Sequence, residues 1–491
     1  MTLTYDQLPY DSFPVPHSHP DALSAIARLF GLRPADVPTC RVLELGCGTG
    51  ANLVPMAAAF PKARFVGVDL SPVQIDQGRV EARASGASNL ELVAADLTTW
   101  AAPAAEPFDF VIAHGVFSWV PREVQEALLA QVKKSLAPQG VAYVSYSALP
   151  GDHPRQALRE MLGWSVRGVS DPKEKVARAR HFAGVLGRHL PDRAPGSAAL
   201  RRFVAEVGAM SDSYVLHDLL ADTHEAISLT SFARRAQAHG LSYLGDAQLH
   251  AMFAGDLEEE VVEALRASAT DQASFEEGMD LFTQRPFRTS LLCHAEAPVR
   301  RDLSWDRLED LHLSTLAQAR GQEDGHWLFR APGGQVFGSP DPLVGSMLTQ
   351  LVHHRPAPVP FAELCDLARA QVDGAKATAA DREILGMNLL AALGAGQVTA
   401  GTCDRSIRAD AGGEKPVAAL ASARRQAASQ GWATNLWHQR VDLDPDQRRL
   451  LPLLDGTRSR AALVAEAKEN ELWLEAHLAS LAELAFLVSN P

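Results

Sequence analysis

The stretch "RVLELGCGTGANL", Arg41 to Leu53, decides the fold of this chain. Apolar residues lead into three glycines within five positions, Gly46, Gly48 and Gly50, and "ANLVPMAAAF" then follows a helical pattern. A strand that ends in a glycine-rich turn and continues as a helix can bind a nucleotide-like cofactor, because glycines let the ligand approach the backbone. The residues around the turn then decide which cofactor is bound.

Strand and helix patterns alternate around this turn. Strands are predicted at "RVLELG", "ARFVGVDL", "LELVAADL", "FDFVIAHG" and "GVAYVSYS", and helices at "HPDALSAIARLFGL", "ANLVPMAAAF", "PVQIDQGRVEARAS" and "REVQEALLAQVKKSL". Strands joined by helices at this spacing pair in parallel through right-handed crossovers. The first half of the chain is therefore predicted to be a doubly wound, Rossmann-like α/β domain.

Acidic side chains stand at the ends of the first three strands, where the ligand of such a sheet binds. Glu44 precedes the first glycine by two residues, Asp69 ends the second strand and Asp96 the third. "GCGTGA" also fits the dinucleotide fingerprint, but a dinucleotide turn is apolar at the position of Glu44 because a pyrophosphate approaches there. A carboxylate there suits the methionine amino group of S-adenosylmethionine, while Asp69 suits the ribose and Asp96 the adenine amino group. Helix capping by the two aspartates is the alternative without a ligand.

These strand ends define the predicted cofactor site, with S-adenosylmethionine as the cofactor and a dinucleotide as the alternative. The residues assigned to the site are Glu44, Gly46, Cys47, Gly48, Gly50, Asn52, Asp69, Leu70, Asp96, Leu97, His114 and Gly115. No metal site is predicted, because the five cysteines form no C-x-x-C pair and the neighbours His17 and His19 have no third ligand in the sequence pattern.

Composition restricts the partners of the protein. The 491 residues include 46 basic and 59 acidic side chains, a formal net charge of −13. Nucleic acids are bound by basic surfaces, so this charge argues against DNA or RNA. No apolar run reaches the about 20 residues that span a bilayer. The scattered cysteines fit a reducing compartment, so we expect a cytoplasmic protein without a membrane partner.

The sheet is predicted to close only after an insertion. Residues 1–150 hold the five strands, and "RQALREMLGWSV" with the polar stretch behind it predicts a helical insertion over residues 151–225, above the cofactor site. A helix and a strand in "TSFARRAQAHGLSYLGDA" and a last strand at "FRTSLLCHAE" then close the sheet within residues 226–297.

The remaining residues repeat one pattern twice. "HWLFRAPGGQVFG" predicts a hairpin, and three helices follow it. Corresponding positions recur about a hundred residues later: Asp341-Pro342 with Asp444-Pro445, and Met347, Leu348 and Leu351 with Leu450, Leu451 and Leu454. Both copies predict winged-helix-like modules, at 298–400 and 401–491, joined by the linker "GTCDRSIRADAGGEKP". Their low positive charge favours protein contact or subunit association, such as a homodimer, over DNA.

Several stretches also recur in a known family. They are "YDQLPYDSFPVPHSHPDALSAIARLFGL", "CRVLELGCGTGANLVPMA", "HGVFSWVP", "YSALPGDH", "YVLHDLL", "FARRAQAHGLSYLGDA" and "FRTSLLCHAE", within residues 5–296. Through them the chain resembles bacterial class I methyltransferases with a methyltransferase regulatory region, of which the rickettsial-type protein-lysine methyltransferases are best understood. The resemblance implies that Gly46, Gly48, Asp69 and Asp96 bind the methyl donor. It also implies that Trp119 and the "YSALPG" turn border the substrate.

Three places depart from the family pattern on the substrate side. Ser147 stands where the family has Asn, and Asp152 stands where it has Trp. "ADTHEAIS", residues 221–228, is less acidic and less aromatic than the usual pattern. These departures leave the cofactor prediction intact and bear on the identity of the substrate.

Candidate residues for the transfer step follow from its chemistry. Methyl transfer is an in-line displacement that requires an aligned nucleophile, and a lysine must first lose its proton. Tyr146 is the candidate catalytic residue that would position the nucleophile, and His217, His153 and Asp218 are weaker candidates for accepting the proton. The candidate substrate contacts are Phe117, Trp119, Tyr146 and His153. Packing or capping is the alternative for each. Tyr5 and Tyr10 flank an N-terminal arm that we expect to fold over the cofactor.

Three functions remain after these arguments. The first is a protein-lysine methyltransferase whose accessory modules dock a protein. The second is a methyltransferase that transfers to nitrogen or oxygen of a small molecule, and the third is a non-catalytic protein that only binds the cofactor. An open acidic groove beside Trp119 would suit a basic peptide, whereas a closed apolar chamber would suit a small acceptor.

Overall fold

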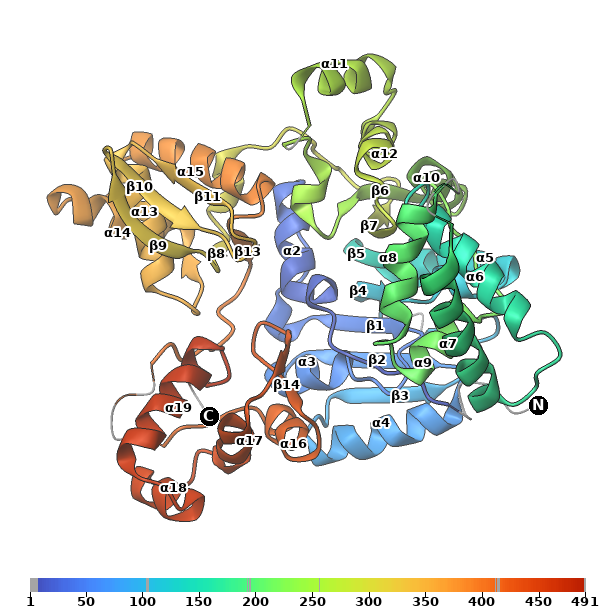
Figure 1. The fold of residues 1–491 in the computed structure, drawn as a ribbon. Helices are drawn as coiled ribbons and strands as arrows, with labels where there is room; N and C mark the ends of the chain where they lie inside the picture. Colours follow the sequence, from blue (N-terminus) through green and yellow to red (C-terminus); the bar gives the residue numbers. More distant parts are fainter. Residues whose placement is uncertain are drawn as a thin grey trace.

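A seven-stranded sheet forms the centre of the protein (Figure 1). The computed structural model describes residues 8–102, 106–191, 193, 196–255, 257–410, 412 and 416–489. The strand order is β3-β2-β1-β4-β5-β7-β6, and β7 runs antiparallel to its neighbours β5 and β6. The strands are β1 (Arg41–Leu45), β2 (Arg64–Asp69), β3 (Leu90–Ala94), β4 (Phe108–Ala113), β5 (Leu136–Ser147), β6 (Leu241–Asp246) and β7 (Phe287–His294). The predicted doubly wound α/β fold is confirmed.

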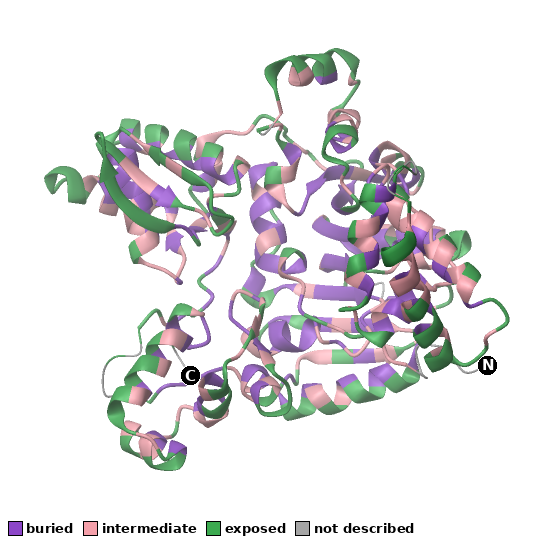
Figure 2. Ribbon diagram, viewed as in Figure 1, coloured by how far each residue is buried: buried purple, intermediate pink, exposed green. Residues whose placement is uncertain are grey.

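Both faces of the sheet are covered because its strands are apolar on both sides. In β4, Phe110 and Ile112 pack on one face, whereas Phe108 and Val111 pack on the other. Helices α2 (Pro20–Leu29), α3 (Leu53–Ala59) and α4 (Pro72–Ala84) cover the first face, and α5 (Arg122–Ser135) and α10 (Leu229–Ala238) the second. Figure 2 shows the sheet buried and the outer sides of these helices exposed.

The segment between β5 and α10 is helical, as the sequence predicts. It consists of α6 (His153–Ser165), α7 (Pro172–His189), α8 (Ser197–Val207) and α9 (Asp212–Tyr214), which continues as a π-helical turn at Val215–Leu219. These helices have a hydrophobic core of their own, in which Leu162 of α6 and Ala179 of α7 are fully buried. Between β6 and β7 the chain forms α11 (Glu259–Ser268) and α12 (Gln272–Thr283), which project from the sheet in Figure 1.

The first accessory module contains the predicted hairpin, which is larger than expected. Strands β10 (His326–Arg330) and β11 (Val336–Ser339) pair antiparallel, and β9 (Gln318–Glu323) adds a third strand. The other elements are β8 (His312–Ser314), α13 (Pro342–His353), β12 (Val359–Pro360), α14 (Phe361–Asp373), α15 (Ala379–Gly394) and β13 (Thr399–Gly401). Sequence periodicity missed β9 because all six of its residues are exposed.

The second module contains α16 (Ala421–Ser429), the hairpin of β14 (Trp432–Thr434) and β15 (Arg440–Asp442), and the helices α17 (Pro445–Leu450), α18 (Arg460–Ala467) and α19 (Glu471–Glu483). The corresponding aspartates play the same part in the two modules. Asp341 and Asp444 each accept hydrogen bonds from backbone N–H groups in the first turn of the helix that follows, α13 and α17.

Within the described residues, no helix has the length and hydropathy needed to cross a membrane.

Candidate active site

The glycine-rich turn lies between the end of β1 and the start of α3. Gly46, Gly48 and Gly50 have positive φ angles of 79°, 54° and 71°, which residues with a side chain rarely adopt. A Cβ atom on Gly46 would also lie 2.3 Å from the Cγ2 atom of Val116. The turn therefore requires glycine, and it brings the backbone to the carboxyl end of the sheet, where ligands bind.

Glu44 is buried directly before this turn, with 3% of its surface exposed. Its Oε1 atom accepts a 3.0 Å hydrogen bond from the Asn52 amide, and its Oε2 atom has no partner among the described residues. Burial raises the pKa of Glu44 to about 8, although the Asn52 hydrogen bond opposes the shift. A buried carboxylate is stabilised by a cation or further donors, so Glu44 is suited to an ammonium group.

Asp69, at the end of β2, is bonded to the turn itself. Its Oδ2 atom accepts a 2.8 Å hydrogen bond from the Gly48 N–H, and its Oδ1 atom accepts one of 2.9 Å from the Ser71 N–H. A carboxylate has about four acceptor positions, so hydroxyl donors can be added to these two bonds. The next residue, Leu70, is 54% exposed and offers an apolar surface beside the carboxylate.

Asp96 lies two residues after the end of β3 and accepts hydrogen bonds within a turn, where no helix begins for it to cap. Its Oδ1 atom accepts hydrogen bonds from the backbone N–H and the hydroxyl of Thr98, at 2.8 and 2.7 Å. These bonds lower the pKa of Asp96, so its exposed carboxylate is ionised at pH 7. The bonds to Thr98 do not preclude contact with a ligand. The next residue, Leu97, is buried.

His114 and Gly115 follow β4 and are held by β5. The Nδ1 atom of His114 lies 3.0 Å from the Tyr143 hydroxyl, and the Gly115 N–H donates a 2.8 Å hydrogen bond to Ser145 Oγ. Burial lowers the pKa of His114 to about 4, so its imidazole is neutral at pH 7. Burial raises the pKa of the Cys47 thiol, which is therefore protonated. Neither group adds charge to the site.

These side chains fit S-adenosylmethionine. Its ammonium would compensate the buried Glu44, its ribose hydroxyls would donate to Asp69, and its apolar ring face would lie against Leu70. When bound, this cofactor supplies a methyl group activated by the positive sulfur. The protein then has to hold the acceptor in line and exclude water.

Polar side chains gather at the end of β5, and two of them, Arg159 and His224, were not named as candidates from the sequence. The Nε2 atom of His224 lies 3.0 Å from Ser147 Oγ and 3.6 Å from Asp152 Oδ2, and its ring centroid lies 4.6 Å from that of Trp119. Arg159 forms a 2.9 Å ion pair with the buried Asp152. Burial and the charge of Arg159 lower the pKa of His224 to about 4. A neutral imidazole thus lies against Trp119, a predicted substrate contact.

The three departures from the family pattern meet in this group. Ser147, Asp152 and His224 come from β5, the start of α6 and the segment before α10, yet they contact one another. The sequence marked each place separately. Only the fold shows that they are a single group beside Trp119.

Asp218 lies next to this group, on the π-helical turn. Such turns occur frequently at functional sites. Its Oδ2 atom is buried without a partner among the described residues. Burial raises the pKa of Asp218 to about 6, although a hydrogen bond from Tyr10 and the charge of Arg159 oppose the shift. Arg159 also donates a 2.9 Å hydrogen bond to the backbone oxygen of Asp218. Arg159 therefore connects Asp218 to the group around Trp119 and His224, because its guanidinium also lies 3.4 Å from His224 Nδ1 and over the Trp119 ring.

Two predicted substrate contacts lie in the protein core. Tyr146 is 1% exposed, its hydroxyl lies 2.9 Å from Ser290 Oγ, and its ring stacks on Phe232 with centroids 4.3 Å apart. Phe117 is fully buried and packs edge-on against the same Phe232 ring. Burial raises the pKa of Tyr146, so its hydroxyl stays protonated. These positions correspond to the packing alternative and do not support a role in positioning the nucleophile.

The two candidate histidines, His217 and His153, make other contacts than those expected of catalytic or substrate-binding residues. The Nε2 atom of His217 donates a 2.7 Å hydrogen bond to the Leu8 carbonyl, and burial lowers the pKa of the imidazole. His153 is exposed at the start of α6, with Nδ1 3.3 Å from the Gln156 side chain. The structure thus brings Asp152, not His153, to His224, which lies against Trp119.

The N-terminal arm connects the insertion to the glycine turn. Besides the contacts of Leu8 and Tyr10, Ser213 donates a 2.8 Å hydrogen bond to Asp11. A Cβ atom on Gly48 would lie 3.0 Å from Ser12 Oγ, so the arm also passes over the turn. Tyr5 lies outside the described residues. No group of three or more metal-binding side chains occurs in the part of the chain that the structure describes.

Comparison with known proteins shows which domains the chain contains. The sequence matches families described as "Methyltransferase domain" over residues 42–140, "Predicted methyltransferase regulatory domain" over 211–294 and "PKMT, C-terminal winged helix domain" over 414–478. A trans-aconitate 2-methyltransferase of Streptomyces coelicolor is 37% identical over 235 residues, which are 43% of this chain and 74% of that protein. Uncharacterized protein RP789 of Rickettsia prowazekii is 28% identical over 477 residues, 94% of this chain and 84% of that protein.

A solved structure matches along almost the whole chain. PKMT2 from Rickettsia typhi has a TM-score of 0.85 at 26% identity, covering 98% of this chain and 100% of that one. Its complex with AdoHcy gives a TM-score of 0.84. The chain therefore belongs to the class I S-adenosylmethionine-dependent methyltransferases. Within that class it combines a regulatory domain with a PKMT-type winged-helix domain, and S-adenosylmethionine is its methyl donor.

Proposed function

We propose that this enzyme methylates the side-chain nitrogen of lysines in a protein substrate. The observation that carries the proposal is the extent of the likeness to PKMT2, a protein-lysine methyltransferase, which covers 98% of this chain. The catalytic sheet alone would say little, because class I methyltransferases with different acceptors share it. The likeness includes the insertion and both accessory modules, which lie outside that sheet.

The group beside Trp119 supports an amine acceptor. A lysine ammonium has an ordinary pKa of about 10.4 and must be bound and deprotonated before it can attack. Asp218 has a pKa of about 6 and an unpartnered buried oxygen among the described residues, so it can hold a cation at pH 7. The neutral His224 and the face of Trp119 would line the aliphatic stem.

The test uses a protein lysate with its lysines either intact or blocked. The enzyme is incubated with methyl-labelled S-adenosylmethionine and the lysate, and with the same lysate after its amines have been acetylated. The proposal predicts label in protein that is recovered as methyl-lysine and lost on acetylation. Label in acetylated protein, or only in small molecules, would contradict it.

Asp218→Asn is expected to weaken acceptor binding and leave the donor site intact. The substitution removes a charge-assisted contact, which corresponds to a loss of roughly tenfold or more in kcat/KM for the acceptor. The dissociation constant for S-adenosylmethionine should not change. Glu160→Gln, which removes an exposed carboxylate on α6, is the matched control. Equal kcat/KM values for Asp218→Asn and the control would remove Asp218 from the acceptor site.

A small-molecule acceptor remains the second candidate. The contact between Ser147, Asp152 and His224 favours it, because these residues change the pocket together relative to the family pattern. In that case the labelled product of the lysate experiment would pass a filter that retains proteins.

A further inference from the structure

The second accessory module reaches the cofactor site through one side chain. His438 lies in the turn between β14 and β15, with a positive φ of 60°, and is 3% exposed. Its Nε2 atom lies 2.8 Å from Oδ1 of Asn52, the residue that precedes α3 and is bonded to Glu44. A residue 386 positions away in the sequence therefore contacts the neighbour of the glycine turn.

The bonds of Asn52 determine which atom is the donor in this contact. The Val15 backbone N–H donates a 2.9 Å hydrogen bond to Asn52 Oδ1, and a backbone N–H can only donate. The Asn52 amide nitrogen therefore faces Glu44 Oε1 and Ser18 Oγ, each at 3.0 Å. It follows that His438 donates from Nε2. All four hydrogen-bonding positions of the Asn52 amide are then filled, which fixes its orientation.

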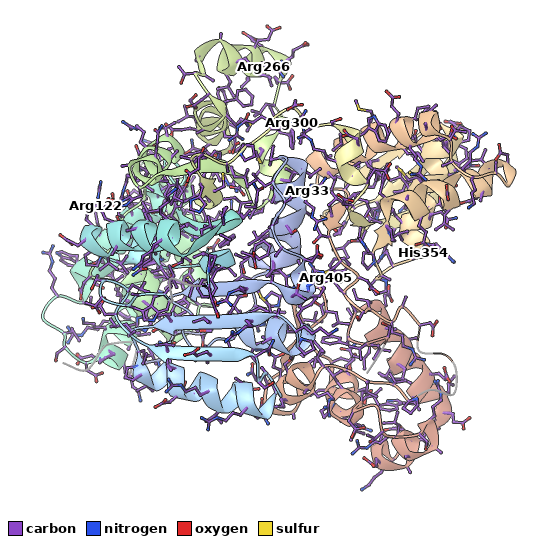
Figure 3. All side chains as sticks on the ribbon, turned by 180° about the vertical axis from the view of Figure 1, so that it is seen from behind. Arg33, Arg122, Arg266, Arg300, His354 and Arg405 are labelled. Carbon is purple, nitrogen blue, oxygen red and sulfur yellow. The ribbon has the colours of Figure 1, made fainter. Side chains whose placement is uncertain are left out.

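The turn that carries His438 is itself anchored to the core. Arg405 forms a buried 2.8 Å ion pair with Asp21 of α2 and donates a 3.3 Å hydrogen bond to the Leu436 carbonyl. Its guanidinium carbon lies 4.6 Å from the ring centroid of Trp437. Arg405 is seen between the core and the accessory modules in Figure 3. The turn thus contains a residue with a strained backbone, His438, and the buried ion pair of Arg405 holds the turn against the core.

We propose that His438 is a positioning residue of the methyl-donor site. It fixes the Asn52 amide, which occupies one oxygen of Glu44 and leaves the other, Oε2, for the ammonium of S-adenosylmethionine. The C-terminal module thereby completes the donor site and sets its affinity, and a displacement of the hairpin turn lowers that affinity. This inference rests on the proposed role of Glu44.

Calorimetric binding of S-adenosylmethionine and of its demethylated product tests the proposal without turnover. His438→Ala should weaken binding by roughly tenfold, the effect of losing one buried hydrogen bond of about 1.4 kcal/mol. His438→Gln keeps an N–H donor at a similar distance and should restore most of the affinity. His477→Ala, a histidine on α19 of the same module, is the control and should bind as the wild type.

A double-mutant cycle separates positioning from a merely structural role. In an Asn52→Ala background, His438→Ala should have no further effect on donor affinity, because its target is gone. Additive losses, or no rescue by His438→Gln, would overturn the proposal. By linkage, the donor should also slow hydrogen exchange at residues 435–438.

The variant Glu44→Gln shows whether the role assigned to Glu44 or only the role assigned to His438 is wrong. If it leaves donor binding unchanged, the assigned role of Glu44 is wrong. If it weakens donor binding while His438→Ala does not, only the role of His438 is wrong.

Discussion

At the scale of single residues, Glu44 is the group that we propose to recognise the donor electrostatically. Burial raises the pKa of this carboxyl from 4.5 to about 8, so at pH 7 it is largely protonated before a cation reaches it. Between pH 4.5 and about 8, Glu44 is protonated in the folded state and ionised in the unfolded state. The contribution of Glu44 to folding stability therefore falls as the pH rises from about 4.5 to 8. A bound ammonium group reverses the preference of Glu44 for its protonated form, because an ion pair requires the ionised carboxylate.

Donor affinity is therefore expected to rise with pH between about 6 and 8. A single released proton gives a slope of at most about tenfold per pH unit. Calorimetry in buffers of different ionisation enthalpy measures the proton that Glu44 releases. Glu44→Gln should bind more weakly, and its affinity should lose this dependence on pH. Proton release that is the same in the wild type and the variant would assign the titration to another group.

The places of the proposed donor-site residues in the fold could be predicted better than those of the proposed acceptor-site residues. Glu44 and Asp69 stand at fixed places around a glycine turn, so their positions follow from strand and turn patterns alone. Tyr146 was assigned to the substrate because it ends a strand, but the alternation of β5 turns it toward Phe232. His224 has no such pattern, because it acquires its neighbours only when the insertion folds over β5.

At the scale of elements, α4 packs directly against the glycine turn. A Cβ atom on Gly78 would lie 2.2 Å from the backbone oxygen of Thr49. The helix can come this close to the turn only because residue 78 has no side chain. Its packing thereby supports the geometry of the donor site.

Gly78→Ala is expected to separate α4 from the turn. The overlap should reduce the free energy of unfolding by about 1–3 kcal/mol and weaken donor binding, as measured by urea unfolding and calorimetry. Gly163→Ala on α6 is the matched control, because nothing lies within 4 Å of the added Cβ atom. It should be neutral or stabilising by up to about 1 kcal/mol. If the two variants are equally stable, the close contact at Gly78 is not needed.

Elements with a clear hydrophobic period could be predicted from the sequence, and others could not. The seven strands of the central sheet and the helices of the insertion have such periods. The π-helical turn at Val215–Leu219 does not, because all five of its residues are buried, polar and apolar alike. Strand β5 begins at Leu136, ahead of the predicted "GVAYVSYS", because Leu136 pairs with Phe108.

At the scale of the whole molecule, the accessory modules are joined to the catalytic core by buried polar contacts. The segment after β13 was predicted to be a linker, yet Arg405 within it is buried against Asp21, 384 positions away. No local pattern in a sequence signals an ion pair at that separation. The C-terminal winged-helix domain could be predicted from the sequence, but its attachment beside the proposed donor site could not.

The central claim is that the methyl group is transferred to a protein lysine. Its most direct test is mass spectrometry of proteins from a lysate treated with the enzyme and with S-adenosylmethionine carrying a heavy methyl group. We expect heavy methyl groups on lysine side chains, and fewer of them after the same time with Glu44→Gln at a donor concentration too low to saturate that variant. Heavy label confined to small molecules would contradict it.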